Sequence, residues 1–430
     1  MPEPRTNLLI LGSGAREHAL ARACAKSPLA GNLFVAPGNP GCTAVARTVP
    51  LNVAEHANVI AFCQKEDIDL VVVGPEAPLV AGLADDLSDA GISCFGPTRD
   101  AARLEGSKGY AKDFCREFGI PTADYRRFRH PNEAKRYIRS RGAPIVVKVD
   151  GLASGKGVVV AKTVDEAEAA VEASFESAGA EVVVEEFLEG EEVSFFALCD
   201  GGVAMPFDSA RDYKRVDEGD KGHNTGGMGA YSPPTIMTPE LGQRIMHEIV
   251  EPTLRGMNQR GSPFRGVLFA GLMVNEFGPK LIEFNVRFGD PEAEVILPRL
   301  RDDLLSLLVA CASGTLRGGP PRFCSDAALA VVMAARGYPG EPLRGSEIKG
   351  LEDAAALPGI VVLHGGTREV DGAVFSDGGR VLTITALGND VADARKRAYA
   401  AIERVKWPEG FFRRDIGWRA TRRDSKKQAL

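Results

Sequence analysis

Short apolar runs alternate with longer amphipathic stretches over the first 120 residues. The apolar runs predict buried strands at residues 7–11, 33–36, 70–73 and 93–95. The stretches between them predict helices, most clearly at residues 16–26 and 80–90. Strand–helix alternation is typical of a parallel α/β sheet, whose ligands gather at the carboxyl ends of the strands. Each predicted strand is followed by a glycine-bearing turn, so this edge can form the rim of a site for a small anionic ligand.

The rest of the chain changes pattern after a predicted helix at residues 104–118. Predicted strands follow at residues 143–150, 158–162, 181–185, 192–199, 264–275, 328–334, 360–363 and 381–385. Predicted helices follow at residues 164–177, 239–259, 302–312 and 391–405. We therefore expect an α/β and α+β multidomain protein. Its units are an N-terminal parallel α/β domain (1–120), a small α+β domain (121–190), a central mixed domain (191–325) and a small C-terminal mixed β domain (326–430).

Residues 280–287 predict a strand with one polar face. Alternate side chains of a strand point to opposite faces, so Glu283, Asn285 and Arg287 share one side. The other side suits a core, with Ile282, Phe284 and Val286. Carboxylate and amide oxygens suit Mg²⁺ and a guanidinium suits phosphate, so the polar face fits a metal–polyphosphate site. A half-exposed edge strand shows the same alternation and stays an alternative.

In the small second domain, a lysine within an apolar run is followed by a glycine-rich loop. Lys148 lies inside an apolar strand pattern, where an ammonium group needs an anion or a route to water. A nucleotide phosphate would meet that need, and snorkelling to solvent is the alternative. The loop at residues 151–157, GLASGKG, is not a Walker A motif, because its spacing is one residue short and glycine follows the lysine. A second glycine-rich stretch, residues 217–232, predicts a long loop that is either mobile or wrapped around a ligand.

Three common kinds of site do not fit the sequence. The first turn reads Gly12-x-Gly14-x-x-Glu17, and no Asp or Glu occurs between Glu17 and Glu55, which argues against NAD binding. A phosphate can still bind at the helix N-terminus behind this turn. Residues 247–251, HEIVE, lack the second histidine of a zinc protease. The eight cysteines form no C-x-x-C pair, as expected for reduced core thiols of a cytoplasmic protein.

Composition restricts the partners. The chain has 430 residues, 44% of them hydrophobic and 26% charged, which is ordinary for a soluble protein of about three domains. A net charge of −6 implies no general affinity for nucleic acid or anionic membranes. The apolar runs are too short to span a bilayer, and the N-terminus has no signal-peptide pattern. We expect a cytoplasmic monomer, with a dimer as the alternative.

Eleven motifs occur in a fixed order along nearly the whole chain. The first six are GSGAREHAL (12–20), VAPGNPG (35–41), VVGPEAPLV (72–80), FGPT (95–98), LEGSKGYAKDF (104–114) and VVKVDGLASGKGVVV (146–160). The others are EEFLEGEEVSF (185–195), NTGGMGAYSP (224–233), IEFNVRFGDPE (282–292), GRVLTITALG (379–388) and RRDIGWRA (413–420). Together they resemble the ATP-grasp superfamily and, within it, the phosphoribosylamine–glycine ligases, also called glycinamide ribonucleotide synthetases.

The resemblance implies a pre-ATP-grasp domain, a lid, a central catalytic domain and a C-terminal domain. Enzymes of this family join glycine to 5-phosphoribosylamine, convert ATP to ADP and phosphate, and release glycinamide ribonucleotide in purine biosynthesis. They use Mg²⁺ or Mn²⁺. The resemblance implies only small-molecule substrates for this chain. Another ATP-grasp carboxylate–amine ligase and a non-catalytic nucleotide-binding protein are the alternatives.

The resemblance also implies roles for individual residues. The ATP phosphates would be held by Lys108, Lys148 and the loop residues Gly151, Ser154, Gly155, Lys156 and Gly157. The adenine would lie against Glu185, Glu186, Phe187 and Leu188, and its ribose would bind Glu192. Glu283 and Asn285 match the metal ligands, and Arg287 would stabilise the transferring phosphate. The candidates for contact with the other substrates are Gly12, Gly14, Glu76, Asp212, Lys214, Arg215, Gly226 and Gly227.

The sequence departs from the family pattern at two places. Many ATP-grasp enzymes place another metal carboxylate about a dozen residues before the Glu-x-Asn pair, where residues 269–272 here contain no acid. Tyr213 stands where the family commonly has histidine, and we expect this change to alter packing rather than chemistry.

Overall fold

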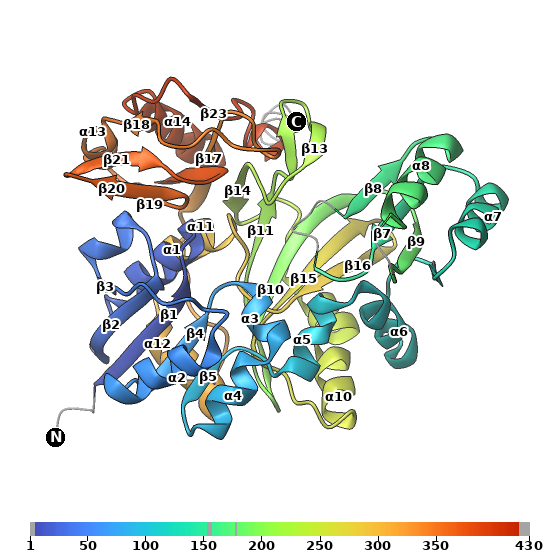
Figure 1. The fold of residues 1–430 in the computed structure, drawn as a ribbon, viewed down its shortest axis with the longest axis horizontal. Helices are drawn as coiled ribbons and strands as arrows, with labels where there is room; N and C mark the ends of the chain where they lie inside the picture. Colours follow the sequence, from blue (N-terminus) through green and yellow to red (C-terminus); the bar gives the residue numbers. More distant parts are fainter. Residues whose placement is uncertain (1–4, 153–156, 177–178, 421–430) are drawn as a thin grey trace.

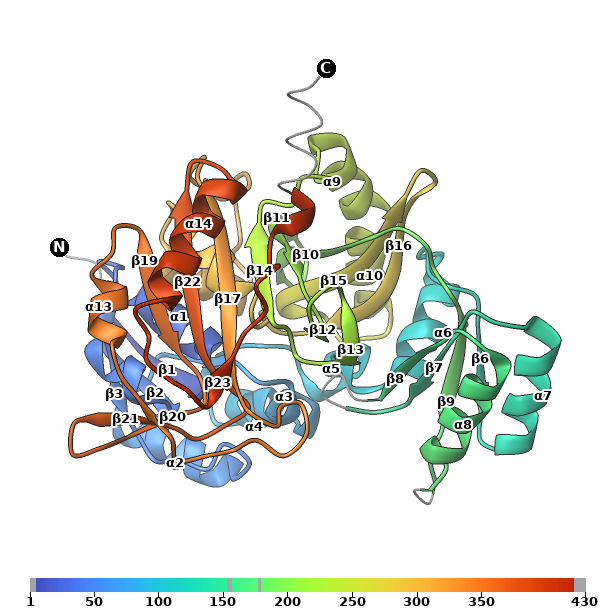
Figure 2. The same ribbon diagram turned by 90° about the horizontal axis from the view of Figure 1, so that it is seen from above.

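The computed structural model describes residues 5–152, 157–176 and 179–420. Within these residues the strands form sheets of five, four and nine strands, together with a two-stranded and a three-stranded ribbon. Figures 1 and 2 show the four-stranded sheet projecting to one side of a larger body that holds the other two. In this described part of the chain, no helix is long and apolar enough to cross a membrane.

The N-terminal sheet is parallel and has the strand order β3-β2-β1-β4-β5. Its strands are β1 (Thr6–Gly12), β2 (Ala30–Pro37), β3 (Arg47–Thr48), β4 (Leu70–Val73) and β5 (Ser93–Phe95). The helices between them are α1 (Ala15–Cys24), α2 (His56–Lys65), α3 (Glu76–Ala81) and α4 (Leu83–Asp89). The strands read as continuous apolar runs because both faces of the sheet are covered; every side chain from Leu8 to Leu11 is at most 1% exposed.

Two helices, α5 (Arg99–Gly106) and α6 (Lys108–Phe118), lead into the projecting domain, which we call the lid. Its antiparallel sheet has the order β6-β9-β7-β8. The strands are β6 (Tyr125–Phe128), β7 (Ile145–Val149), β8 (Val158–Ala161) and β9 (Val182–Glu186). The helices α7 (Pro131–Arg141) and α8 (Val164–Ser174) pack on this sheet around a small core of their own.

The third sheet is antiparallel and continues from the central part of the chain into the C-terminal part, in the order β16-β15-β10-β11-β14-β17-β22-β19, with β23 beside β17. Its first strands are β10 (Glu191–Asp200), β11 (Ala204–Asp212), β14 (Gly229–Ser232), β15 (Arg265–Asn275) and β16 (Gly278–Asn285). Its later strands are β17 (Ala327–Ala335), β19 (Ile360–His364), β22 (Arg380–Gly388) and β23 (Gly410–Phe411). Because the sheet is continuous, residues from both parts of the chain line one cavity, which is described below.

The remaining elements cover or connect these sheets. The helices are α9 (Pro239–Ile245), continued through a π-helical turn into α10 (Glu251–Gln259), and α11 (Ala293–Ile296), α12 (Leu304–Ser313), α13 (Leu351–Ala355) and α14 (Val391–Ile402). The ribbons are formed by β12 (Arg215–Asp217) with β13 (Lys221–Asn224), and by β18 (Glu347–Ile348), β21 (Ala373–Ser376) and β20 (Thr367–Val370).

Three sequence predictions need correction. The helix predicted at residues 80–90 is two helices, because Gly82 adopts a left-handed conformation with φ of 95° between α3 and α4. The helix predicted at residues 104–118 spans parts of α5 and α6, which an extended Ser107 separates. The loop predicted at residues 217–232 contains two strands. β13 forms a local hairpin with β12, whereas β14 lies between β11 and β17, and its pairing with the distant β17 could not be read locally.

The strand predicted at residues 280–287 forms, but it ends at Asn285 and contains a β-bulge. Leu281 pairs with Leu272 and Glu283 with Gly271, so Ile282 is the extra residue. The bulge shifts the alternation, and Leu281 joins Phe284 and Val286 in the core. Ile282 is half-buried on the cavity wall and does not belong to this core cluster, contrary to the prediction.

Candidate active site

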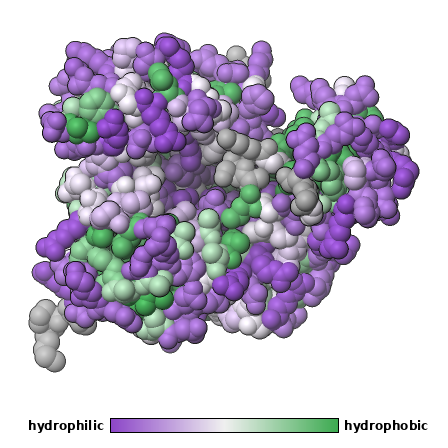
Figure 3. All heavy atoms as spheres, in the orientation of Figure 1, coloured by the Kyte–Doolittle hydropathy of each residue, from purple (hydrophilic) through white to green (hydrophobic). Residues whose placement is uncertain are grey.

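A cavity of about 830 Å³ lies where the lid, the N-terminal domain and the large sheet meet. Figure 3 shows a hollow with hydrophilic residues in its depth between the C-terminal part and the N-terminal domain. The sequence-predicted residues on its walls are Glu76, Lys108, Lys148, Gly151, Gly157, Glu185, Glu186, Phe187, Leu188, Glu192, Asp212, Lys214, Arg215, Gly226, Glu283, Asn285 and Arg287. Ser154, Gly155 and Lys156 lie outside the described residues.

The predicted metal and phosphate residues come together on one wall. Glu283 and Asn285 extend from β16, and Arg287 follows the strand and donates from Nη2 to Asn285 Oδ1 at 3.2 Å. Arg287 also forms ion pairs with Glu76 (3.4 Å) and Glu105 (3.1 Å). The arginine therefore connects the end of β16 to α3 and α5 of the N-terminal domain.

The two predicted phosphate-binding lysines approach this wall from different elements. Lys148, on β7, is 3% exposed and donates to the carbonyl oxygen of Ile282 at 3.1 Å. Lys108, the first residue of α6, donates to the carbonyl oxygen of Gly151 at 2.6 Å. Burial lowers the pKa of Lys108, an effect that the nearby Glu283 carboxylate opposes. Both cations thus lie at the junction of the lid with the body.

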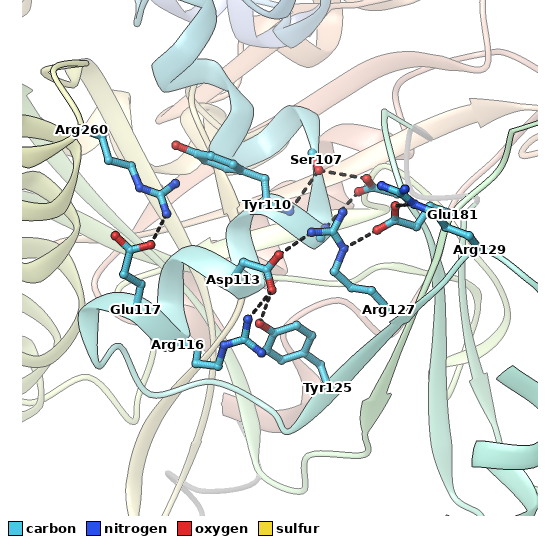
Figure 4. Close-up of polar contacts among 12 residues, drawn as sticks. Ser107, Tyr110, Asp113, Arg116, Glu117, Tyr125, Arg127, Arg129, Glu181 and Arg260 are labelled. Carbon is cyan, nitrogen blue, oxygen red and sulfur yellow. Dashed lines mark hydrogen bonds and ion pairs between the residues drawn. The ribbon is translucent and has the colours of Figure 1, made fainter. Parts of the chain in front are cut away.

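Side-chain contacts tie the lid to α6, as Figure 4 shows for part of this junction. The Asp113 carboxylate accepts from the Tyr125 hydroxyl at 2.6 Å and pairs with Arg127. Arg127 in turn pairs with Glu181, next to β9. Asp150, at the end of β7, accepts from Ser107 Oγ at 2.9 Å and from the Gly109 backbone N–H at 3.0 Å, at the N-terminus of α6.

Several acids surround Lys214 beside Glu283, and their charges affect one another's pKa values. Lys214 pairs with Glu192 and lies 3.8 Å from Glu283. Burial raises the pKa of Asp212 well above its usual value, opposed by Lys214 and reinforced by Glu292. Burial also raises the pKa of the Glu292 carboxyl. Burial tends to raise the pKa of Glu283 as well, but Lys214, Lys148, Lys108 and Arg287 together lower it below the usual value. Glu283 is therefore ionised at neutral pH, which its predicted role as a metal ligand requires.

Three predicted glycines are not on the cavity wall: Gly12, Gly14 and Gly227. The Gly14 N–H donates to Glu17 Oε2 at 2.6 Å, so the turn already binds a carboxylate from its own helix. A Cβ at Gly12 would lie 2.5 Å from Glu17 Cδ, which explains the glycine there. Whether this turn also binds a substrate group stays a prediction.

The structure adds wall residues that the sequence reading did not select: Arg16, Glu105, Lys112, Asp290, Glu292 and Arg380. Arg380, on β22, donates to the carbonyl oxygens of Gly226 (2.6 Å) and Asp290 (2.7 Å) and forms an ion pair with the Asp290 carboxylate (3.1 Å). Each of these residues lies in one of the motifs quoted above, and this was the only feature of the sequence that could have marked it as a site residue. Their convergence depends on contacts between distant segments, as between Arg380 and Gly226.

Comparison with known proteins agrees with this architecture. The models of the phosphoribosylglycinamide synthetase N domain, ATP-grasp (A) domain and C domain match residues 6–105, 106–293 and 328–419. The chain belongs to the phosphoribosylglycinamide synthetase family. This is the family that the motifs resemble, under another of its names.

Individual relatives match over nearly the whole length. A phosphoribosylamine–glycine ligase of Mesorhizobium japonicum is 59% identical over 97% of this chain and 99% of its own. The crystal structure of a phosphoribosylamine–glycine ligase from Thermotoga maritima has a TM-score of 0.84 and 33% identity, over 96% of this chain and all of its own. The biotin carboxylase domain of a Hydrogenobacter thermophilus 2-oxoglutarate carboxylase shares the fold, with a TM-score of 0.72 at 16% identity, over 95% of this chain and 92% of its own.

Proposed function

We propose that this member of the phosphoribosylglycinamide synthetase family ligates glycine to 5-phosphoribosylamine and converts ATP to ADP and phosphate. The observation that carries the proposal is the convergence of Lys108, Lys148, Glu283, Asn285 and Arg287 on one cavity. They come from α6, the lid and the end of β16, in a chain with family relatives over its full length.

The chemistry needs an activated carboxyl group, because a carboxylate is a poor electrophile. A glycine carboxylate oxygen attacks the γ-phosphorus of ATP, which forms glycyl phosphate and releases ADP. The amine of phosphoribosylamine then attacks the acyl carbon, phosphate leaves with that carboxylate oxygen, and the nitrogen loses a proton. Catalysis of phosphoryl transfer rests mainly on positioning and on charge stabilisation. A cavity with several fixed cations is suited to that task.

We assign the nucleotide to the lid side of the cavity. Lys108 and Lys148 would bind its phosphates, together with the loop at residues 151–157. The segment 185–188, at the end of β9, would bind the adenine, and Glu192 the ribose hydroxyls. Arg287 would stabilise the phosphate during transfer, since its guanidinium is already oriented by Glu76, Glu105 and Asn285.

A divalent metal ion fits the donor set on β16. Glu283 and Asn285 offer the hard oxygen atoms that Mg²⁺ or Mn²⁺ prefers. Within the described residues no cluster of three or more His, Cys, Asp or Glu side chains forms a complete metal cage. This agrees with the absence of an acid at residues 269–272 and fits an ion that shares its shell with nucleotide phosphates. When bound, the ion would neutralise phosphate charge.

We assign glycine and phosphoribosylamine to the remaining walls, near Glu76, Asp212, Lys214, Arg215 and Gly226. These residues come from α3, β11, the segment that follows β11, and the loop that Arg380 holds. Lys214 lies 3.8 Å from Glu283, and Glu76 pairs with Arg287, so these walls border the residues assigned to the metal and the phosphate. The glycyl phosphate would thus form between the nucleotide and the incoming amine.

A coupled assay of ADP release tests this function. The complete mixture contains ATP, Mg²⁺, glycine and freshly prepared phosphoribosylamine, and we expect turnover only when all four are present. Replacing glycine with bicarbonate, formate or alanine should abolish ADP release, which separates this activity from that of other ATP-grasp ligases. Well-folded protein that releases ADP without dependence on glycine would overturn the proposal.

A further inference from the structure

Lys112 is a buried cation on the cavity wall that the reaction described above does not use. It lies on α6 and is only 4% exposed. Its ammonium nitrogen lies 2.8 Å from Glu185 Oε2. A second ammonium group, that of Lys148, lies 3.0 Å from the other oxygen of the same carboxylate. An ammonium group this deeply buried is costly unless it is paired, so the arrangement calls for an explanation.

The three side chains form a buried triad in which one carboxylate serves two lysines. The side chains of Lys112, Lys148 and Glu185 are each at most 5% exposed, so solvent screens their charges weakly. Lys148 contacts Glu185 Oε1 as an ion pair without hydrogen-bond geometry, and the ammonium donates instead to the Ile282 carbonyl oxygen. The triad carries a net charge of about +1 with both lysines protonated, whereas Glu185 and Lys148 alone would be neutral.

Lys112 also fixes the triad to the strand that carries Glu283. Its ammonium group donates to Thr122 Oγ1 at 2.7 Å, and that hydroxyl donates to the Leu281 carbonyl oxygen at 2.6 Å. Lys148 bonds the next carbonyl along β16, that of Ile282 in the bulge. The two lysines therefore hold adjacent peptide groups of β16, immediately before Glu283.

We infer that Lys112 is a positioning residue for the nucleotide: by occupying one oxygen of Glu185 it keeps Lys148 directed at the phosphates and set at a fixed distance from Glu283. Without Lys112, both Glu185 oxygens are free to bind Lys148. The phosphate site then loses one positive charge, and Lys148 is drawn toward the carboxylate. This inference rests on the proposed ATP-dependent reaction. The alternative is that Lys112 only fastens the lid to α6.

Calorimetric titration with magnesium ADP tests the inference without requiring turnover. We expect K112M to raise the dissociation constant about tenfold or more, and K112R to restore much of the affinity, since it retains the charge. K280M is the matched control: Lys280 pairs with Glu186 beside the triad but is half-exposed, and we expect it to stay within twofold of the unsubstituted protein.

A double-mutant cycle separates positioning from simple fastening. If Lys112 acts through Lys148, adding K112M to K148M should change the affinity less than twofold beyond K148M alone. A merely structural role predicts that the two effects multiply, or that K112M leaves the affinity of folded protein unchanged, and either result overturns the inference. Failure of the unsubstituted protein to bind magnesium ADP would instead contradict the proposed function itself.

Thr122→Val keeps the inference testable if K112M does not fold. Valine retains the shape of threonine and removes only the hydroxyl between Lys112 and Leu281, so every charge of the triad remains. We expect about a threefold rise in the dissociation constant for magnesium ADP, with an unchanged circular dichroism spectrum. An unchanged affinity in this variant would overturn the inference.

Discussion

Glu283 keeps its charge in surroundings that would otherwise suppress it. Burial tends to raise the pKa of its carboxyl group, and the ammonium groups of Lys214, Lys148 and Lys108 lower it further than burial raises it. Two of these lysines, Lys108 and Lys148, are also the residues that we assign to the nucleotide phosphates. Charge balance in this cavity is therefore shared between the protein and its substrates.

Glu283→Ala tests the importance of this carboxylate. We expect a loss of turnover on the order of 10²–10³-fold, because one preorganised charge at a phosphoryl-transfer site is removed. The fold should persist, since the side chain faces the cavity and belongs to no core cluster among the described residues. Steady-state kinetics and circular dichroism give the two readouts.

Glu276→Ala is the matched control, because Glu276 lies exposed in the turn between β15 and β16. It should leave turnover and stability unchanged. An inactive but folded Glu283→Ala beside an active Glu276→Ala is the expected pair of results. Unfolding of Glu283→Ala would instead favour a structural role for this residue.

The alternation of polar and apolar residues at 280–287 identified the polar face of that strand, but it did not identify the other residues that surround the face. Glu283, Asn285 and Arg287 were predicted to share a face, and all three line the cavity. Ile282 was misplaced because a β-bulge depends on the partner strand and leaves no reliable mark in one sequence. Arg380 could not be placed at all, since its contact with Gly226 joins residues 154 positions apart.

At the scale of elements, the lid is joined to the body by side-chain contacts rather than by a shared sheet. Its four strands pair only with one another among the named strands of the described chain, apart from a single bridge between Thr122 and Leu281 near its base. The contacts at the base include Asp113 with Arg127 and Asp150 with Ser107. Such a junction can move as a unit more easily than a strand inside a sheet.

Hydrogen exchange of residues 122–190 tests this view of the lid. We expect its amides to exchange more slowly when magnesium and a non-hydrolysable ATP analogue are present, because the nucleotide would join the lid to β16. Peptides from β17 and β22, at the centre of the C-terminal part of the large sheet, serve as the internal control and should not change. Equal protection of the lid with and without nucleotide would argue against nucleotide-dependent closure.

The sequence predicted strands of the core better than the ends and partners of elements. Leu70–Val73 and Ser93–Phe95 were predicted with their observed bounds. Leu70–Val73 was the clearer of the two, because a buried parallel strand is short and wholly apolar. The sequence predicted one helix at residues 80–90 where the structure has two. The division could not be predicted, since Gly82 can either continue or end a helix. The nine-stranded sheet could not be predicted, because β14 pairs with β17 nearly a hundred residues later.

At the scale of the molecule, the N-terminal and C-terminal parts meet through two histidines, of which His18 is buried and His364 half-buried. His18 on α1 accepts at Nδ1 from the backbone N–H of His364, on β19, at 3.0 Å. Asn39 donates to the His364 carbonyl oxygen at 2.8 Å. Burial lowers the pKa of His18 to about 3 and that of His364 to about 4. Both imidazoles are therefore neutral at physiological pH, which keeps the acceptor at His18 Nδ1 available.

This contact predicts a loss of stability in mild acid. The folded-state pKa values lie below the ordinary histidine value near 6.5, so between about pH 6.5 and 4 the unfolded chain binds more protons. The free energy of unfolding should thus fall as the pH decreases through that window. Urea unfolding at pH 7.5 and pH 5 measures the difference.

Two substitutions assign the effect to this interface. His18→Asn should weaken the pH dependence, because it removes the titrating group. It should reduce stability at pH 7.5 by about 1–3 kcal/mol, because the smaller side chain leaves part of a buried site unfilled even though its amide oxygen can still accept from the His364 N–H. His247→Gln replaces an exposed histidine and should change neither quantity. The same acid sensitivity in His18→Asn as in the unsubstituted protein would exclude His18 as its source.

The central claim is that this cavity activates the carboxylate of glycine through ATP. Glycine labelled with ¹⁸O at both carboxylate oxygens, turned over with ATP and phosphoribosylamine, tests it by mass spectrometry of the released phosphate. A glycyl phosphate pathway predicts one ¹⁸O atom in each phosphate, and the other in the amide product. Phosphate free of ¹⁸O, formed at the rate of ligation, would contradict the account.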